Sequence, residues 1–265
     1  MSTSPRAPAR RIVSLTCSNT EIVAALGCGD RLVGVDDHSD YPAELLVGLP
    51  RVGPDLGIDV EAVAALQPDL VLASLTVPGH EKVVAAVEAA GLPFIAPAPT
   101  SLDEIYRDIR EIGGLLDVAE RAEQVAIDMA EALEPFDPPA RRPTIAVQWW
   151  PKPVILPGRK SWVHDLIERA GGRNLLGDEA VESRPVPDDE LARLAPDAIV
   201  LSWCGVEEAK YRPDVVAGNP AFAEIPAVRD DRIVSITEAW LGRPSPRLVD
   251  GYRALRPVVE ACLDS

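Results

Sequence analysis

The sequence predicts an α/β fold made of two Rossmann-like lobes with parallel sheets, and two observations carry this prediction. Short apolar runs of strand length alternate with runs of helical spacing, which is typical of βαβ units. The second half of the chain also repeats a pattern found in the first. A length of 265 residues, with 47% hydrophobic and 26% charged residues, suffices for two compact globular domains.

The first half opens with two strands, predicted at residues 11–15 and 31–35. Between them, Asn19 or Thr20 is expected to cap a helix that Gly27 ends. A polar loop with several prolines follows, and it excludes continuous regular structure. The remaining elements of this half are expected as a helix at 60–66, a strand at 69–74, a helix at 82–90 and a strand at 93–96.

Two helices should follow this half. Ser101 and Glu104 form a capping box that predicts a helix start, and the Gly113–Gly114 pair is expected to end that helix. Apolar residues keep helical spacing over 117–133, which predicts a second helix roughly 25 Å long at 1.5 Å per residue. The proline-rich stretch at 136–143 breaks regular structure and marks the domain boundary.

The second half repeats the first. A strand at 144–147 and a helix at 163–170 lead into a polar loop with two prolines. Residues 189–202 then match 61–74 in type, with an acidic start, a short helix, a Pro-Asp turn, an apolar strand and a serine. The match predicts two lobes of like topology. The alternative is chance similarity between two ordinary βαβ units.

Charge and hydropathy exclude several partners. The net charge is -16, with an isoelectric point near 4.6, and this field repels nucleic-acid phosphates and anionic lipid surfaces. No run of about 18 apolar residues occurs, so no membrane insertion is expected. The start of the chain, residues 1–11, is polar and basic, and no apolar stretch of signal-peptide length follows it. Taken alone, this predicts a cytoplasmic protein.

The sequence carries no catalytic signature. It has no nucleophile elbow, no Walker loop and no glycine-rich dinucleotide fingerprint, so we expect a protein that is not an enzyme and has no intrinsic cofactor. The four cysteines lack the spacing of a zinc site or a disulfide framework. His80 and His164 have no acidic or cysteine neighbours at metal-ligand spacing, and no metal site made by the protein alone is expected.

Aromatic residues gather where ligands bind in open parallel sheets, beyond the carboxyl ends of the strands. Four of the five tryptophans follow predicted strands of the second half: Trp149, Trp150, Trp203 and Trp240. They predict an aromatic wall suited to a large, flat, mostly apolar ligand. The alternative is that one or two of these rings pack on the sheet.

Two polar residues of the first half occupy a similar place. His38 and Tyr41 follow the second predicted strand. His38 is a candidate ligand contact, or an axial donor to the metal of a bound chelate, and the alternative is an exposed histidine without a role.

Several segments follow one another in a specific order and spacing. They are SLTCSNTEIVAALG from Ser14, VGV from Val33, SDYP from Ser39, the run at 61–74, AGGRN from Ala170 and AVRDDRIV from Ala227. Together they resemble the substrate-binding proteins of ABC importers for cobalamin, haem and ferric siderophores. The resemblance covers nearly the whole chain from Arg11.

This resemblance implies two lobes joined by one long helix, with a ligand cleft between the lobes. The expected segments are a disordered lead over 1–10, an N-terminal lobe over 11–116, a linking helix over 117–134 and a C-terminal lobe over 141–265. It also implies a monomer in the periplasm or at the cell surface. The partner would be an ABC permease dimer, and an acid on each lobe would dock there: Glu61 on the first, and Asp189 or alternatively Glu190 on the second.

The resemblance is greatest to cobalamin-binding members, which implies a corrinoid ligand. His38 stands where those members have a ligand-contacting tyrosine, and the second-half tryptophans fall near their aromatic contacts. Asp55 stands roughly where they have a ligand-stacking tryptophan. Arg243 is a further candidate contact, although the second lobe lacks the arginine-lined cleft that suits a ferric catecholate. The alternatives are a haem or ferric-siderophore binding protein, a cytoplasmic corrinoid or metabolite handler without a role in transport, or a cryptic enzyme.

Overall fold

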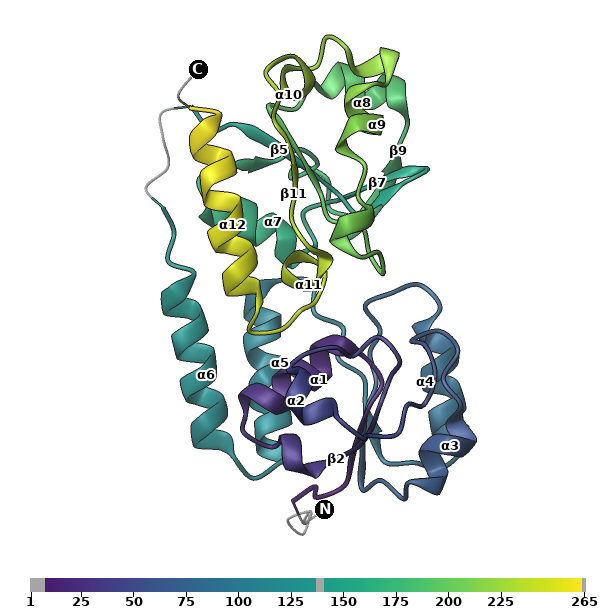
Figure 1. Cartoon of the computed structure of the whole chain (residues 1–265). Coiled ribbons are helices and arrows are strands. Elements are labelled where there is room, and N and C mark those ends of the chain that lie inside the picture. Colours follow the sequence, from purple (N-terminus) through teal and green to yellow (C-terminus); the bar gives the residue numbers. More distant parts are fainter. Residues whose placement is uncertain (1–7, 137–140, 264–265) are drawn as a thin grey trace. The chain divides into compact units, whose positions relative to one another are not determined.

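A computed structural model describes residues 8–136 and 141–263, which divide into two compact units (Figure 1). Unit 1 holds the described residues up to Pro99 together with Asp103–Asp128. Unit 2 holds Thr100–Leu102 and the described residues from Met129 onward. The chain therefore passes for the last time from unit 1 to unit 2 inside the helix that the sequence predicts at 117–134. The linking role of that helix stays a prediction.

Unit 1 is built on a parallel sheet with the strand order β2-β1-β3-β4. The strands are β1 (Ile12–Ser14), β2 (Leu32–Val35), β3 (Leu70–Leu72) and β4 (Phe94–Ile95). The residues of β1 and β3 are almost entirely buried, as expected for a sheet covered on both faces. Each strand falls inside its predicted range, so the α/β fold with parallel sheets is confirmed for this half.

The helical segments of unit 1 surround this sheet. They are α1 (Cys17–Ala25), η1 (Gly29–Arg31), α2 (Ala43–Leu46), α3 (Val60–Ala65), α4 (His80–Ala89), and most of α5 (Leu102–Leu115) and α6 (Ala119–Ala132). The predicted cap of α1 is wrong, because the helix begins at Cys17 with Thr16 as its N-cap. Asn19 lies inside the helix, where its side-chain amide donates to the Ala73 carbonyl at 2.8 Å. Asn19 resembles a cap in the sequence because the carbonyl that it bonds, at Ala73, lies far away along the chain.

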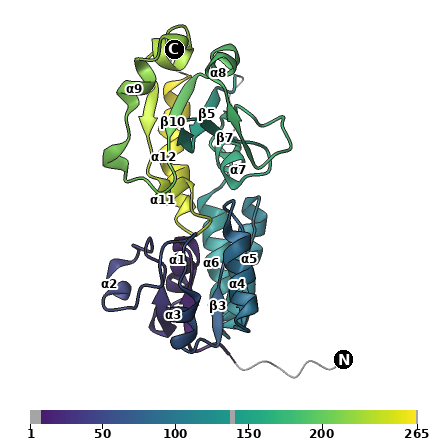
Figure 2. The ribbon, with the colours of Figure 1, turned by 90° about the vertical axis from the view of Figure 1, so that its right-hand side faces the viewer.

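The expected helix break at Gly113–Gly114 is also wrong, since α5 continues through both glycines to Leu115. In Figure 2, α5 and α6 lie side by side. A Cβ at Gly113 would lie 2.2 Å from the Ala122 Cβ on α6, whereas a Cβ at Gly114 would meet nothing within 4 Å. Gly113 therefore permits close helix packing, and the helix ends later, near Asp117 with its φ of 57°.

Unit 2 contains a second parallel sheet and a small antiparallel one. The parallel sheet has the order β11-β10-β5-β8, and the antiparallel sheet has the order β6-β7-β9. The strands are β5 (Thr144–Gln148), β6 (Trp150–Pro151), β7 (Val154–Pro157), β8 (Arg173–Asn174), β9 (Ser183–Val186), β10 (Ala198–Leu201) and β11 (Ile233–Ser235). The predicted polar loop is thus partly wrong, because β9 forms there with Pro185 in an edge strand, where a missing N–H is tolerated.

The helices of unit 2 complete its core. They are α7 (Trp162–Arg169), α8 (Asp188–Leu194), α9 (Pro213–Ala217), α10 (Pro226–Arg229), α11 (Glu238–Leu241) and α12 (Leu248–Ala261), with the 3-10 turns η2 (Glu208–Lys210) and η3 (Pro220–Phe222). The long α12 packs on α7 and α11 (Figure 1). The Ser161 hydroxyl caps α7 by accepting from the Val163 N–H.

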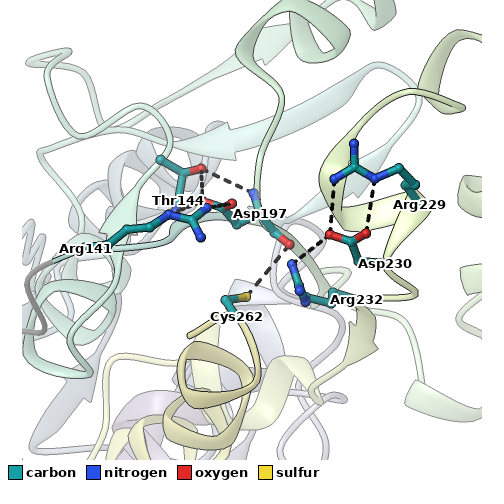
Figure 3. Close-up of polar contacts among 7 residues, drawn as sticks. All are labelled: Arg141, Thr144, Asp197, Arg229, Asp230, Arg232 and Cys262. Carbon is teal, nitrogen blue, oxygen red and sulfur yellow. Dashed lines mark hydrogen bonds and ion pairs between the residues drawn. The ribbon is translucent and has the colours of Figure 1, made fainter. Parts of the chain in front are cut away.

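The internal repeat is present in three dimensions. In each unit the strand after the Pro-Asp turn pairs in parallel with the first strand, β3 with β1 and β10 with β5. The aspartate of each turn fixes the start of that first strand. Asp69 accepts from the backbone N–H groups of Arg10 and Arg11, and Asp197 accepts from the Thr144 N–H at 2.8 Å. Figure 3 shows Asp197 among its partners, including Arg141.

The expected disordered lead over 1–10 needs correction at its end. Residues 1–7 lie outside the described part of the chain. Ala9 is buried and its N–H donates to the Leu115 carbonyl at 3.0 Å, while the Arg10 N–H is held by Asp69. Unit 1 therefore includes the residues just before β1, because their backbone N–H groups donate to Asp69 of the Pro-Asp turn.

Candidate ligand-binding site

The predicted site residues lie at the carboxyl ends of the parallel strands. In unit 1 these ends lead into residues 36–42 after β2 and 73–80 after β3. In unit 2 they lead into residues 149–153 after β5, 202–206 after β10 and 236–243 after β11. We call these loops the exit surface of each unit. In unit 1 the exit surface also includes residues 53–57, which contact the loop at 36–42. Sheets of this kind bind ligands there.

A buried carboxylate shapes the loop that carries His38. Asp36 is fully buried and accepts hydrogen bonds from the Ser39 hydroxyl at 2.5 Å and from the His38 backbone N–H at 2.9 Å. The Ser39 hydroxyl also lies 2.8 Å from Thr20 Oγ1 on α1. Arg51 donates to the carbonyls of Asp36 and Ser39. Desolvation by burial raises the pKa of Asp36. These bonds fix the loop to α1 and thereby the position of His38.

Asp55 lies between two histidines in unit 1. The His38 Nε2 lies 3.9 Å from Asp55 Oδ1, and the His80 Nε2 lies 3.6 Å from Asp55 Oδ2. The His38 side chain is 53% exposed and that of His80 only 3%. The His80 imidazole holds the pKa of the Asp55 carboxyl below its usual value. Sequence spacing gives His80 no acidic neighbour at metal-ligand spacing, but the fold brings Asp55 next to it from a distant loop.

Large apolar side chains on the same loops face solvent. Tyr41 is 48% exposed, Leu56 54%, Leu75 42% and Val77 41%. A Cβ at Gly79 would lie 3.0 Å from the Leu56 Cδ2, so the Asp55 loop packs directly on the segment before His80. An exposed apolar group of this kind, around polar side chains, is typical of a ligand-contacting surface.

Trp203 belongs largely to the core of unit 2. Its side chain packs 5.2 Å from Tyr211 between ring centroids, and its Nε1 donates to the Gln148 Oε1 at 3.0 Å. The Tyr211 hydroxyl donates to the Trp203 carbonyl and accepts from the Glu238 N–H, which joins the loops after β10 and β11. Trp203 therefore fits the alternative that some of these tryptophan rings pack on the sheet, because its indole N–H already has a buried partner.

Trp149 and Trp150 differ in their surroundings although they are adjacent. The Trp149 ring lies 6.2 Å from Trp162, and its Nε1 is buried without a hydrogen-bond partner among the described residues. Trp150 is 42% exposed, and its Nε1 donates to the Lys152 carbonyl at 3.1 Å. The Trp162 Nε1 donates to the Leu241 carbonyl. The exposed Trp150 ring is therefore available to a ligand, whereas the Trp149 N–H is enclosed within the unit.

The loop after β11 carries the remaining predicted contacts of unit 2. Trp240 lies on the short helix α11 and is half-buried. The Arg243 Nε lies 3.4 Å from the Glu238 Oε2, and both side chains are mostly buried. Because this carboxylate offsets its charge, Arg243 attracts anions less than an isolated arginine would.

A cavity of about 280 Å³ opens beside Trp203 in unit 2. Its walls are mainly apolar, and the polar members are Gln148, Lys152, Asp188 and Asn219. This volume lies at the lower end of ligand pockets. It fits a side group of a ligand better than a whole macrocycle.

The predicted docking acids take equivalent places in the two units. Glu61 is the second residue of α3 and Asp189 the second residue of α8. Both are exposed, and neither forms an ion pair within the described chain. Glu190 instead pairs with Arg184, which lies 2.7 Å away and also binds Glu179. Of the two candidate acids of unit 2, Asp189 is therefore the one without an ion pair among the described residues.

Metal and membrane features are limited in the described residues. Within 8–136 and 141–263, histidine, cysteine and acidic side chains form no group of three or more that could hold a metal ion. None of the helices in these ranges is long and apolar enough to cross a membrane.

Comparison with known proteins now places the chain in a family. Residues 12–239 match the model of the periplasmic binding protein family. The chain belongs to this family. A vitamin B12-binding protein of Vibrio parahaemolyticus is 27% identical over 262 residues, covering 96% of this chain and 89% of the relative.

Two solved structures of similar proteins have the same fold. The periplasmic vitamin B12 binding protein BtuF of Vibrio cholerae has a TM-score of 0.77 at 26% identity, covering 97% of this chain and 99% of its own. The periplasmic heme-binding protein RhuT of Roseiflexus, in apo form, has a TM-score of 0.79 at 27% identity, covering 96% and 99%. The two-lobe α/β fold and the resemblance to substrate-binding proteins of ABC importers are thus confirmed.

Membership defines the class of activity. Periplasmic binding proteins of this kind bind small solutes and work with ABC permeases, and they are not enzymes. The family implies a periplasmic or cell-surface location, and the expectation of a cytoplasmic protein has no support.

Proposed function

We propose that this periplasmic binding protein binds a corrinoid and delivers it to an ABC importer permease. The observation that carries the proposal is the near full-length similarity to proteins named as vitamin B12-binding, both in sequence and in solved structure. The ligand would contact the exit surfaces, where parallel sheets bind ligands.

Aromatic side chains of unit 2 support a flat ligand. Trp150 is exposed, Trp149 has an unpartnered indole N–H, and Trp240 is half-buried at the exit of β11. Such rings offer large apolar contact area together with a hydrogen-bond donor.

The test of ligand binding is calorimetry with cobalamin, cobinamide and haemin, accompanied by tryptophan fluorescence. All five tryptophans belong to unit 2, so a corrin bound there should quench the emission. Trp149→Ala and Trp240→Ala should each weaken binding about fivefold or more, equivalent to roughly 1 kcal/mol. Leu194→Ala, which removes a comparably exposed apolar side chain on α8, serves as the control. Absence of binding to all three compounds would refute the proposal.

Delivery to the permease is proposed to use Glu61 and Asp189. Their exposure and equivalent positions on α3 and α8 support this role, and the engagement of Glu190 by Arg184 makes Glu190 the weaker candidate. Glu61→Lys with Asp189→Lys should abolish ligand-dependent stimulation of the cognate permease in vesicles without changing ligand affinity. Glu190→Gln should keep most of it. Unimpaired stimulation by the double variant would refute docking through these two acids, whereas absence of stimulation by the wild type would favour a binding protein without a transport role.

Haem is the second candidate ligand. The exposed imidazole of His38 at the exit of β2 favours it, because histidine nitrogen is a common axial donor to haem iron. If haemin binds, His38→Ala should shift its Soret band, whereas a ligand held only by apolar contacts would leave the band unchanged.

A further inference from the structure

The contact between Asp55 and His80 is unusual because the buried imidazole forms no hydrogen bond within the described chain. Only 3% of the His80 side chain is exposed, and neither ring nitrogen has a hydrogen-bond partner in the described chain. Buried polar groups are normally satisfied, so an unpartnered imidazole calls for an explanation. Its Nε2 lies 3.6 Å from the Asp55 Oδ2, slightly beyond hydrogen-bond distance.

Asp55 itself is accessible from the other side. Its side chain is 37% exposed, and its second oxygen lies 3.9 Å from the exposed His38 ring. Leu56 follows Asp55 in the chain, and Leu75 and Val77 lie on the loop that leads to His80; all three are exposed apolar residues. The carboxylate therefore has one oxygen next to a buried imidazole and lies in a surface that suits an apolar ligand body.

A negative charge in such a place discriminates between ligands by their edges. A carboxylate accepts hydrogen bonds from amide or ammonium groups and repels other carboxylates, and water screens this less within an apolar surface. The corrin of cobinamide carries amides at its edge, whereas haem carries two propionates. A site with an ionised Asp55 should therefore bind ligands with amides at their edge more tightly than ligands with carboxylates there.

We propose that Asp55, which accepts from the Leu56 N–H at 2.9 Å and lies beside the buried His80, is a specificity-determining residue that selects ligands with an amide edge and rejects ligands with a carboxylate edge. This inference rests on the proposed binding of a tetrapyrrole. His80 acts as a positioning residue, because it is buried and reaches a ligand only through Asp55.

The test compares cobinamide with cobyrinic acid, which has the same macrocycle but carboxylates in place of amides. Both are used as dicyano complexes in excess cyanide, so that coordination by His38 does not contribute. The measured quantity is the ratio of their dissociation constants for the wild type and for Asp55→Asn, which keeps the shape and removes the charge. We expect Asp55→Asn to reduce the preference for cobinamide about tenfold, the effect of one partly screened charge.

Two further variants separate position from net charge. Asp30→Asn makes the same charge change in the exposed η1 turn before β2, at the other end of the sheet, and should alter the ratio less than twofold. His80→Leu removes the partner of Asp55 and should reduce the preference severalfold, whereas His80→Gln keeps a donor and should restore most of it. Far-UV circular dichroism checks folding, and Asp55→Asn decides the question if His80→Leu does not fold.

The outcomes distinguish this inference from the proposed function. A wild type that binds neither corrins nor haemin overturns both. A wild type that binds cobinamide, with an unchanged ratio in Asp55→Asn, overturns the inference alone. If haemin is the ligand that binds, Asp55→Asn should tighten its binding severalfold, and an unchanged affinity likewise overturns the inference.

Discussion

The two neighbouring glycines of α5 should respond oppositely to the same added methyl group. Gly114→Ala places a Cβ where nothing lies within 4 Å, whereas Gly113→Ala places one 2.2 Å from the Ala122 Cβ of α6. Alanine is more favourable than glycine inside a helix by about 1 kcal/mol. Both variants gain this helix preference, but only Gly113→Ala also introduces a clash.

The clash sets the size of the difference. Carbon atoms in contact normally lie about 3.5–4.0 Å apart, and both methyl groups are attached to helix backbones, so the helices themselves must move. Overpacking of this kind costs about 1–3 kcal/mol. Taking the upper end because no side-chain rotation relieves it, Gly113→Ala should lower the free energy of unfolding by about 2 kcal/mol, while Gly114→Ala raises it by about 1 kcal/mol.

Urea unfolding followed by far-UV circular dichroism measures both changes. The double variant Gly113→Ala with Ala122→Gly moves the methyl from one helix to the other and should return the stability close to that of the wild type. The coupling energy of this cycle is then about 3 kcal/mol. Equal stability of Gly113→Ala and Gly114→Ala would refute the close packing of α5 on α6.

Three further changes test other parts of the fold. Asp108 is 5% exposed and has one oxygen without a hydrogen-bond partner among the described residues, and desolvation raises its pKa to about 6. The folded chain therefore holds more protons than the unfolded chain between about pH 4 and 6. The free energy of unfolding consequently falls as the pH rises through that window. Asp108→Asn should thus stabilise the protein at pH 8 by about 1–3 kcal/mol and change little at pH 4, as measured by urea unfolding at both pH values. Asp197→Ala removes the acceptor of the Thr144 N–H and hydroxyl and should destabilise unit 2 by about 2–3 kcal/mol in unfolding followed by tryptophan fluorescence. Tyr211→Phe removes the hydroxyl that joins Trp203 and Glu238, which should cost about 1 kcal/mol in the same measurement and weaken corrin binding.

Local patterns predicted most of the parallel framework. The apolar runs that became β1, β3, β5 and β10 are short, continuous and bounded by turns, and the Pro-Asp turns before β3 and β10 revealed the repeat. These signals lie within a few neighbouring residues, where sequence is most informative.

The missed features depend on residues far apart in the chain. The β6-β7-β9 sheet formed across a segment rich in proline, since an edge strand tolerates Pro185. The α5 helix continued through Gly113 because Ala122 needs the space. The same holds in the candidate site, where Leu56 packs beside Gly79 and His80 lies next to Asp55, 25 residues away in the chain. Periodicity does not contain such tertiary contacts.

The repeat also separates what supports the fold from what recognises a ligand. At the amino ends of the central strands the two units use the same device, an aspartate that accepts N–H groups of the preceding chain, in Asp69 and Asp197. At the carboxyl ends they differ, because unit 1 presents Asp55 between two imidazoles and unit 2 presents indoles such as Trp150. A requirement for stability alone would allow the carboxyl ends of the two units to stay as similar as their amino ends. Divergence at the carboxyl ends, beside a shared device at the amino ends, is the pattern expected when the carboxyl ends of each sheet recognise a ligand.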